Sequence, residues 1–271
     1  MLLKLLIGIL LLYCAAAAAL FFAQTSILFP SRLVPPAGPL PPGAERIALT
    51  VSDGVQLEGV VIRPSRPAAS ATAILGFTGN ASNAAGIAEF LHSLYPEHPV
   101  IAFHYRGYAP SGGRPSAAAL LEDAPLLYDV ARERLRPDKL VVVGISLGSG
   151  VAAGLAARRP VDGLILVTPF DSLKAVAREQ FPWLPVSLLL RHNLASDDYL
   201  RNSQVPVAIV AADRDEVNPP RRTEALRRAV GNLVFSSTIP GTQHNTIAYH
   251  PQFEAEMRKA LERVVSASRG R

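Results

Sequence analysis

Cysteine is almost absent from this sequence of 271 residues, which contains only Cys14. A single cysteine cannot form a disulfide within the chain, so a fold held together by disulfides is excluded. Cysteine usage therefore does not indicate an oxidising or a reducing compartment. Charge is also scarce, because Asp, Glu, Lys and Arg make up 18% of the residues, whereas apolar residues make up 49%. This balance excludes disorder for most of the chain and predicts a large packed core.

Motifs for metals, nucleotides and nucleic acids are missing as well. No cluster of histidine, cysteine and carboxylate residues has ligand spacing, so we expect no bound metal. The glycine-rich segments lack the arrangements that bind dinucleotides or nucleoside triphosphates, so we expect no cofactor. The formal net charge is +5, but no aromatic stacking platform or groove-reading motif accompanies the basic residues. We therefore predict no nucleic-acid partner and interpret the positive charge as a solvated face near anionic lipid.

The N-terminus holds a long uncharged run. Residues 5–23 contain no charged side chain, and this length meets the roughly 18 residues that a helix needs to cross a bilayer. We predict a single transmembrane anchor over residues 1–24. Lys4 and the terminal amine precede the run, which favours a cytoplasmic N-terminus and an exported, periplasmic domain. The alternative is a signal peptide, cleaved near Ala17–Ala19, that would release a secreted protein.

A proline-rich segment follows the apolar run. Between residues 30 and 43 it contains Pro30, Pro35, Pro36, Pro39, Pro41 and Pro42. Such a segment is extended and semi-rigid and cannot pack as a helix. We predict a stalk over residues 25–44 and one folded domain over residues 45–268.

Within that domain, short apolar runs alternate with helical patterns. Two strands at residues 47–52 and 55–62, joined by the turn residues Asp53-Gly54, predict an antiparallel hairpin. Buried strands are expected at residues 71–77, 100–105, 139–145, 164–168, 205–212 and 234–239, and helices at residues 84–94, 117–135, 151–158 and 221–230. Near-continuous apolar strands separated by helices indicate a mostly parallel sheet covered on both faces. A hairpin that leads into such a sheet predicts the α/β-hydrolase fold.

The segment Gly144-Ile145-Ser146-Leu147-Gly148 is a candidate nucleophile motif. It follows the apolar run at residues 140–143 and opens a helix of small residues, which is the strand–turn–helix context that G-x-S-x-G requires. The flanking glycines let neighbouring backbone approach a strained turn without a Cβ clash. We predict that Ser146 is a catalytic nucleophile near a helix N-terminus, whose dipole favours a developing anion.

The acid and the histidine of a triad follow the nucleophile in this fold. Asp213 and Asp215 both lie just beyond the strand at residues 205–212, and we choose Asp215 as the acid, leaving Asp213 as a carboxylate that orders the loop. His244 lies in a loop after the strand at residues 234–239, whereas His250 precedes a proline at a helix start. We therefore predict that His244 transfers the proton and that Asp215 holds its tautomer.

An oxyanion hole needs two main-chain donors. One is expected from the residue after the nucleophile, Leu147, and the other from the loop after the strand at residues 71–77. Gly79 frees the backbone of that loop, so the N–H of Asn80 is the candidate donor. An alternative interpretation is that this loop caps the following helix through Ser82 or Asn83, and both roles can hold together.

Taken together, these motifs resemble the membrane-anchored α/β-hydrolases of the bud-emergence-related (Bem-like) group, in bacterial form. The resemblance covers nearly all of residues 26–260. Its most specific parts are Ile27-Leu28-Phe29-Pro30, Tyr105-Arg106-Gly107-Tyr108, the segment around Ser146, Asp215-Glu216-Val217, and the residues from Gly241 to Asn245. It implies catalytic roles for Ser146, Asp215 and His244. This chain has Thr78-Gly79 where the family has His-Gly, His104 where it has Asp, and Ser82 where it has Gly.

Residues 170–203 form an insertion between two predicted strands, with apolar side chains and two prolines, Pro182 and Pro185. Either it forms a cap over the active site or its helices pack in the ordinary way. A tethered hydrolase with an apolar cap would suit acyl or lipid-like esters. Two alternatives remain: an amidase or serine aminopeptidase that uses the same triad, and a catalytically idle membrane scaffold.

Overall fold

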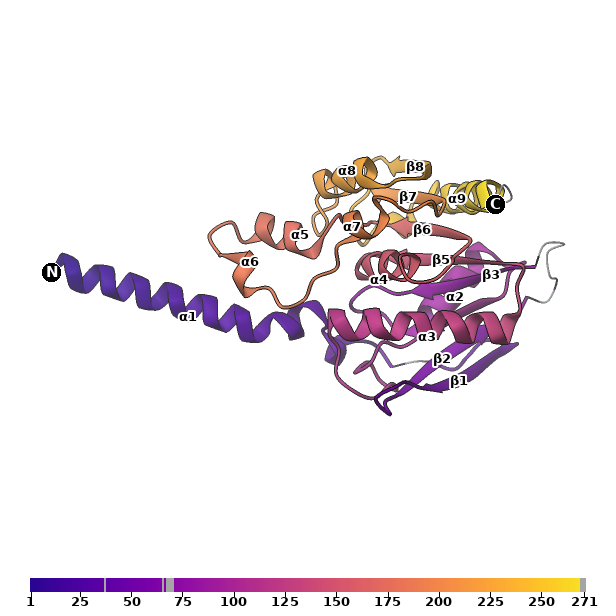
Figure 1. The fold of residues 1–271 in the computed structure, drawn as a ribbon, viewed down its shortest axis with the longest axis horizontal. Helices are drawn as coiled ribbons and strands as arrows, with labels where there is room; N and C mark the ends of the chain where they lie inside the picture. The colour runs from indigo at the N-terminus through magenta and orange to yellow at the C-terminus, as the bar shows by residue number, and fades with distance from the viewer. Residues whose placement is uncertain (37, 65, 67–70, 269–271) are drawn as a thin grey trace.

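The structure is a computed structural model that describes residues 1–36, 38–64, 66 and 71–268 (Figure 1). Within these residues an eight-stranded sheet has the order β1-β2-β4-β3-β5-β6-β7-β8. The strands are β1 (Ala44–Thr50), β2 (Gln56–Ile62), β3 (Thr72–Phe77), β4 (Val100–Phe103), β5 (Lys139–Ile145), β6 (Gly163–Val167), β7 (Val207–Ala212) and β8 (Leu233–Ile239). The helices are α1 (Leu2–Leu28), α2 (Ala84–Leu94), α3 (Ala117–Leu135), α4 (Leu147–Ala156), α5 (Leu173–Gln180), α6 (Val186–Leu189), α7 (Ser196–Leu200), α8 (Pro220–Ala229) and α9 (Phe253–Ala267), with short 3-10 turns at Ser31–Leu33 and Ile247–Tyr249.

The topology of the sheet confirms the predicted α/β-hydrolase fold. Strand β1 pairs antiparallel with β2, β2 pairs antiparallel with β4, and the remaining neighbours are parallel. The hairpin turn forms at the predicted dipeptide, where Gly54 has φ +81° and the carboxylate of Asp53 accepts the N–H of Val55 at 3.2 Å. Because parallel strands end at the same edge, the loops after β3, β5, β7 and β8 meet there.

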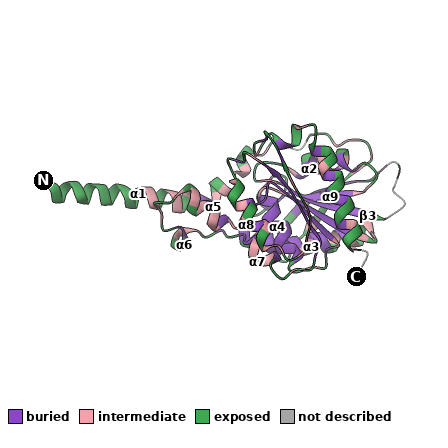
Figure 2. Cartoon of the chain, turned by 90° about the horizontal axis from the view of Figure 1, so that it is seen from above, coloured by how far each residue is buried: buried purple, intermediate pink, exposed green. Residues whose placement is uncertain are grey.

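Helices cover both faces of the sheet and divide the core into two clusters. In β5, Leu140 and Val142 pack with α3 and α4, whereas Val141 and Val143 face α2 and α9. This alternation follows from the period of two in a strand. Figure 2 shows the result as a buried sheet between helices that expose one side. The rigid layers position the loops at the carboxyl edge.

The N-terminal helix continues to Leu28, past the predicted anchor boundary at residue 24. The chain then turns onto the folded domain, where Phe29 is 2% exposed in the core and Val34 packs against it. Asn83 also donates a side-chain hydrogen bond to the carbonyl of Pro35 at 3.0 Å. Much of the predicted stalk therefore lies against the domain, because burial of its apolar side chains lowers the free energy of the folded state. Residue 37, within that stalk, lies outside the described residues.

The insertion between β6 and β7 lies beside α1. Its helices α5 and α6 flank the end of α1 that enters the domain (Figure 1). Residues from both segments, including Phe21 and Leu28 of α1 and Phe181 and Leu189 of the insertion, line one apolar crevice. The insertion therefore contacts the N-terminal helix directly.

Candidate active site

The turn that carries Ser146 is strained and tightly packed. Strand β5 ends at Ile145 and α4 begins at Leu147, so Ser146 occupies the turn with φ +52° and ψ −118°. A Cβ on Gly148 would lie 2.3 Å from the carbonyl oxygen of Phe77, and one on Gly144 would lie 2.5 Å from the carbonyl oxygen of Gly148. Only glycine permits this approach of strand, turn and helix. The backbone strain lies at Ser146, just before the N-terminus of α4, and such strain is common at functional sites.

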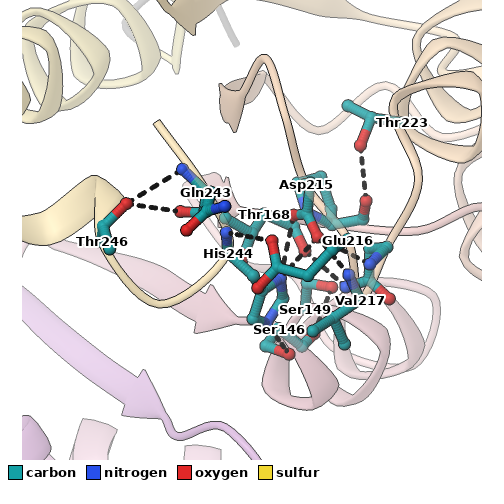
Figure 3. A network of polar contacts seen from close by, with 12 residues as sticks. Ser146, Ser149, Thr168, Asp215, Glu216, Val217, Thr223, Gln243, His244 and Thr246 are labelled. Atoms are coloured by element: carbon teal, nitrogen blue, oxygen red, sulfur yellow. Dashed lines mark hydrogen bonds and ion pairs between the residues drawn. The ribbon is translucent and has the colours of Figure 1, made fainter. Parts of the chain in front are cut away.

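The three predicted triad side chains lie in one hydrogen-bonded chain (Figure 3). The Oγ of Ser146 lies 2.8 Å from Nε2 of His244. The Nδ1 of His244 lies 2.9 Å and 2.8 Å from the two carboxylate oxygens of Asp215. A proton on Nδ1 that is donated to Asp215 leaves Nε2 free to accept the serine hydroxyl proton. The arrangement can therefore perform nucleophilic catalysis with general-base assistance.

Main-chain donors hold the carboxylate of Asp215 in place. Its Oδ1 accepts the N–H of Val217 at 3.0 Å and that of Asn218 at 2.7 Å. Asp215 is 4% exposed, so these bonds offset the loss of water around the charge. The amide of Asn218 in turn donates to the carbonyl of Thr168 at 2.7 Å, which ties the acid loop to the end of β6.

Asp213 and His250, the alternatives to the predicted pair, lie elsewhere. Oδ1 of Asp213 accepts the N–H of Thr242 at 3.1 Å, so this carboxylate ties the acid loop to the histidine loop. A second tie joins the N–H of His244 to the Glu216 carboxylate at 3.2 Å. The Nδ1 of His250 instead accepts the N–H of Gln252 at the approach to α9, at 3.3 Å.

The loop that carries Asn80 lies next to the nucleophile. A Cβ on Gly79 would be 3.7 Å from that of Ser146, and Asn80 and Ser146 line the same cavity. Two buried tyrosines bind the main chain of this loop. Tyr105 donates to the carbonyl of Thr78 at 2.9 Å, and Tyr108 donates to the carbonyl of Asn80 at 2.8 Å. Burial raises the pKa of both hydroxyls, so they remain donors at neutral pH. The other candidate donor, Leu147, is the first residue of α4.

Sequence reasoning did not assign the two tyrosines to the loop that carries Asn80. The signal was present as Tyr105-Arg106-Gly107-Tyr108, but the spacing does not say which carbonyls the hydroxyls reach. Arg106 between them pairs with Asp123 through two bonds of 2.7 and 2.5 Å, and with Asp53 at 2.7 Å. The hydrogen bonds to Asp123 raise the pKa of the guanidinium. This ion pair fixes the segment that carries both tyrosines.

His104 supports the far end of the same loop. Its Nδ1 lies 3.4 Å from the N–H of Ala84, the first residue of α2, while its Nε2 is buried with no hydrogen-bond partner among the described residues. His104 is 2% exposed. Burial, with a smaller contribution from Arg46, lowers the pKa of this imidazole from 6.5 to about 4. The folded protein therefore holds His104 in its neutral form.

The stability of the domain should consequently fall in mild acid. Between pH 6.5 and pH 4 the imidazole of His104 binds a proton in the unfolded chain but not in the folded chain. The free energy of unfolding is therefore undiminished by this group above pH 6.5 and falls as the pH is lowered below that value. We expect about 2 kcal/mol less stability at pH 5 than at pH 7 from this group. Urea unfolding of the detergent-solubilised protein measures it. His104→Asn, which keeps an acceptor for Ala84, should flatten the dependence; an equal loss in both proteins would refute this role.

A cavity of about 570 Å³ opens beside Ser146 and His244. Apolar side chains line much of it, among them Ile87, Phe90 and Phe253. Of the described residues in the insertion at 170–203, none lines this cavity. In the described part of the chain, no three histidine, cysteine, aspartate or glutamate side chains gather in an arrangement that could hold a metal ion.

Comparison with known proteins places the chain in a family. A family model described as the alpha/beta hydrolase fold matches residues 74–190. An uncharacterized protein of Mycobacterium tuberculosis is 33% identical over 222 residues, covering 78% of each chain. Protein bem46 of Schizosaccharomyces pombe is 30% identical over 212 residues, covering 74% of this chain and 71% of that protein. The chain belongs to the Bem-like group of α/β-hydrolases.

Other relatives of this Bem-like hydrolase carry descriptive names. The lysophosphatidylserine lipase ABHD12 of Danio rerio is 32% identical over 213 residues, covering 66% of this chain and 55% of that protein. Among solved structures, an esterase of Pyrococcus furiosus superimposes with a TM-score of 0.66 at 18% identity, covering 85% of this chain and 98% of the esterase. At that identity the structural likeness supports the fold alone. One sequence relative of this chain, the zebrafish protein, is thus named as a lipase.

Proposed function

We propose that this Bem-like protein is a serine hydrolase that cleaves ester bonds of acyl or lipid-like substrates through an acyl-enzyme. The observation that carries the proposal is the continuous hydrogen-bonded chain from Ser146 through His244 to Asp215, at the side of an open cavity. A triad is recognised by this geometry and these roles. The lipase name of the zebrafish relative supports an ester substrate.

In the proposed mechanism, Oγ of Ser146 attacks the ester carbonyl while Nε2 of His244 takes the hydroxyl proton. The negative charge on the carbonyl oxygen would be held by the N–H groups of Leu147 and Asn80, each worth about 3 kcal/mol of barrier. The attack forms a tetrahedral intermediate. Its collapse breaks the ester bond, and the alcohol leaves with the proton from His244. A water molecule, deprotonated by His244, then attacks the acyl-enzyme and releases the acid with Ser146 restored.

Labelling with a fluorophosphonate probe tests this proposal. Full-length protein in detergent should react covalently with the probe, since only an activated serine displaces its fluoride. Ser146→Ala should abolish labelling, and peptide mapping should place the adduct on Ser146. A folded protein that is not labelled would favour an idle scaffold instead. Faster turnover of an aryl amide than of the matching ester would favour the amidase alternative.

We also propose that α1 anchors this hydrolase in a membrane, with the catalytic domain exported. The helix has 27 residues, which is long enough to cross a bilayer, and a mean hydropathy of 2.6 in its most apolar part. Lys4 is the only charged side chain in its first turns, and positive charge favours the cytoplasmic side. A C-terminal alkaline phosphatase fusion should be active, because this reporter folds only outside the cytoplasm. An inactive fusion would indicate that the catalytic domain lies on the cytoplasmic side.

A further inference from the structure

The tip of the insertion is as free of charge as residues 5–23 of the N-terminal helix. Residues 181–190 contain no Asp, Glu, Lys or Arg. We call these ten positions the insertion tip. Arg191 follows the tip directly, and Arg178 precedes it, separated from it by Glu179 and Gln180. The guanidinium of Arg191 lies over the ring of Phe21 in α1, 4.8 Å from its centroid. Arg178 donates to the hydroxyl of Ser187 within the tip, so both arginines lie against the tip and α1. An apolar stretch with arginines beside it is typical of segments that enter a membrane interface.

The insertion tip runs along α1 (Figure 1). Near its start, the hydroxyl of Tyr13 donates to the carbonyl of Trp183 at 3.2 Å, and the two rings meet edge to face at 6.0 Å. Near its end, Gln24 donates to the carbonyl of Leu189 at 3.1 Å. Contacts with the tip therefore extend along α1 from residue 24 back to residue 13.

The length of α1 then decides where the insertion tip lies. Residues 2–12, which precede the contact at Tyr13, span about 16 Å at 1.5 Å per residue. A bilayer has a hydrocarbon core about 30 Å thick. Roughly half of the membrane-spanning length must therefore come from Tyr13 and the residues after it, which is the part of α1 that the tip covers. A helix that crosses the bilayer in this arrangement carries the tip with it into the hydrocarbon.

We propose that residues 181–190 enter the leaflet on the side of the catalytic domain as a re-entrant element beside α1. This insertion rests on the membrane anchor proposed above, and a lipid bilayer covers the exposed face of the tip. Leu188 and Trp183 are 83% and 49% exposed. In the leaflet these side chains contact acyl chains instead of water, which stabilises insertion.

The backbone of the insertion tip suits that environment. Non-helical backbone is tolerated at membrane depth only where its polar groups are paired within the protein. Pro182 and Pro185 have no N–H, and the N–H groups of Leu184 and Leu190 bond to carbonyls of the tip at 3.0 and 2.9 Å. Polar groups of α1 supply the donors to Trp183 and Leu189. This pairing explains why the apolar helix α1 holds a buried glutamine, Gln24.

Insertion of the tip would set the catalytic cavity at a fixed height above the bilayer. Gln180, the last residue of α5 before the tip, donates to the carbonyl of Val217 at 3.1 Å. Val217 lines the cavity beside Ser146. Two attachments, α1 and the tip, restrict rotation of the domain more than one helix does.

Trp183 is the only tryptophan in the chain, so its fluorescence reports the depth of the tip directly. The full-length protein is reconstituted in phosphatidylcholine–phosphatidylglycerol vesicles whose acyl chains carry bromine, and iodide is added to the water as the opposing quencher. We expect strong quenching by the brominated acyl chains and several-fold weaker quenching by iodide than in a control. The control is Trp183→Phe with Glu133→Trp, an exposed position near the end of α3 whose neighbour Arg134 pairs with Glu45 of β1.

Strong quenching by iodide with none from the lipid would overturn the proposal, and so would protection from both quenchers, since that would mean burial within protein. A second variant, Leu188→Glu, should raise iodide quenching several-fold, because a charge is tolerated at an exposed position in water but not in a leaflet. Intact mass of the reconstituted protein separates the causes of failure. A chain that begins near Leu20 would refute both the proposed anchor and the proposed insertion of the tip. The proposed hydrolase activity would stand, because labelling of Ser146 does not depend on the anchor.

Discussion

Replacement of either Ser146 or His244 by alanine should abolish ester hydrolysis almost as fully as replacement of both. Each single change should lower kcat by roughly 10⁴- to 10⁶-fold, and the double change should cost little more. The reason is that attack and proton transfer form one step, which fails when either the Oγ or the Nε2 at 2.8 Å from it is removed. Steady-state hydrolysis of a short-chain activated ester by purified protein measures the effect.

Two matched variants serve as controls for that experiment. Ser149 lies one turn further along α4, and its Oγ donates to the carbonyl of Ser146 at 2.6 Å. Ser149→Ala should keep kcat within about tenfold of the parent, since it removes a hydroxyl without removing the attacking group. His250→Ala should remain active. An active His244→Ala with an inactive His250→Ala would move the general base to His250, and an active Ser146→Ala would refute the proposed mechanism.

Asp215→Asn should lower kcat by about 10³- to 10⁴-fold with little change in stability. An asparagine amide turned toward Nδ1 of His244 offers N–H groups, so the imidazole must carry its proton on Nε2, where it can no longer accept from Ser146. The asparagine oxygen can still accept the N–H groups of Val217 and Asn218, which keeps the loop folded. Kinetics with the same activated ester and thermal unfolding of each protein provide the two measurements.

Asp213→Asn is the matched control, because it makes the same chemical change two residues away. Its oxygen can keep the bond to the N–H of Thr242, and the side chain does not contact His244. We expect a loss in kcat of less than about tenfold. If Asp213→Asn proves the more damaging substitution, Asp213 is the acid and the contact with Asp215 has a structural role.

Local sequence patterns sufficed for most of the fold. The helices predicted at 84–94 and 117–135 begin and end at those residues, because Asn83 and Ser116 cap their N-termini through side-chain oxygens. The strand predicted at 139–145 also has those bounds. The first turn of α4 was missed, since the helix begins at Leu147 and not at residue 151. Glycine and serine have weak helix propensity, and there the packing of Gly148 against β3 decides the outcome.

The sequence by itself determined the chemical types in the candidate site: a serine in a glycine-flanked turn, two aspartates after one strand and a histidine after the next. The order of strands in a parallel sheet brings those loops to one edge. Only the tertiary structure decided which aspartate contacts His244, because both residues follow the same strand, two positions apart. The loop conformation directs the carboxylate of Asp215 to His244 and that of Asp213 to the N–H of Thr242. It also decided what Tyr105, Tyr108 and the insertion do. Their partners, the carbonyls of Thr78 and Asn80 and the side of α1, lie far away in sequence, and no local pattern encodes contacts at that distance.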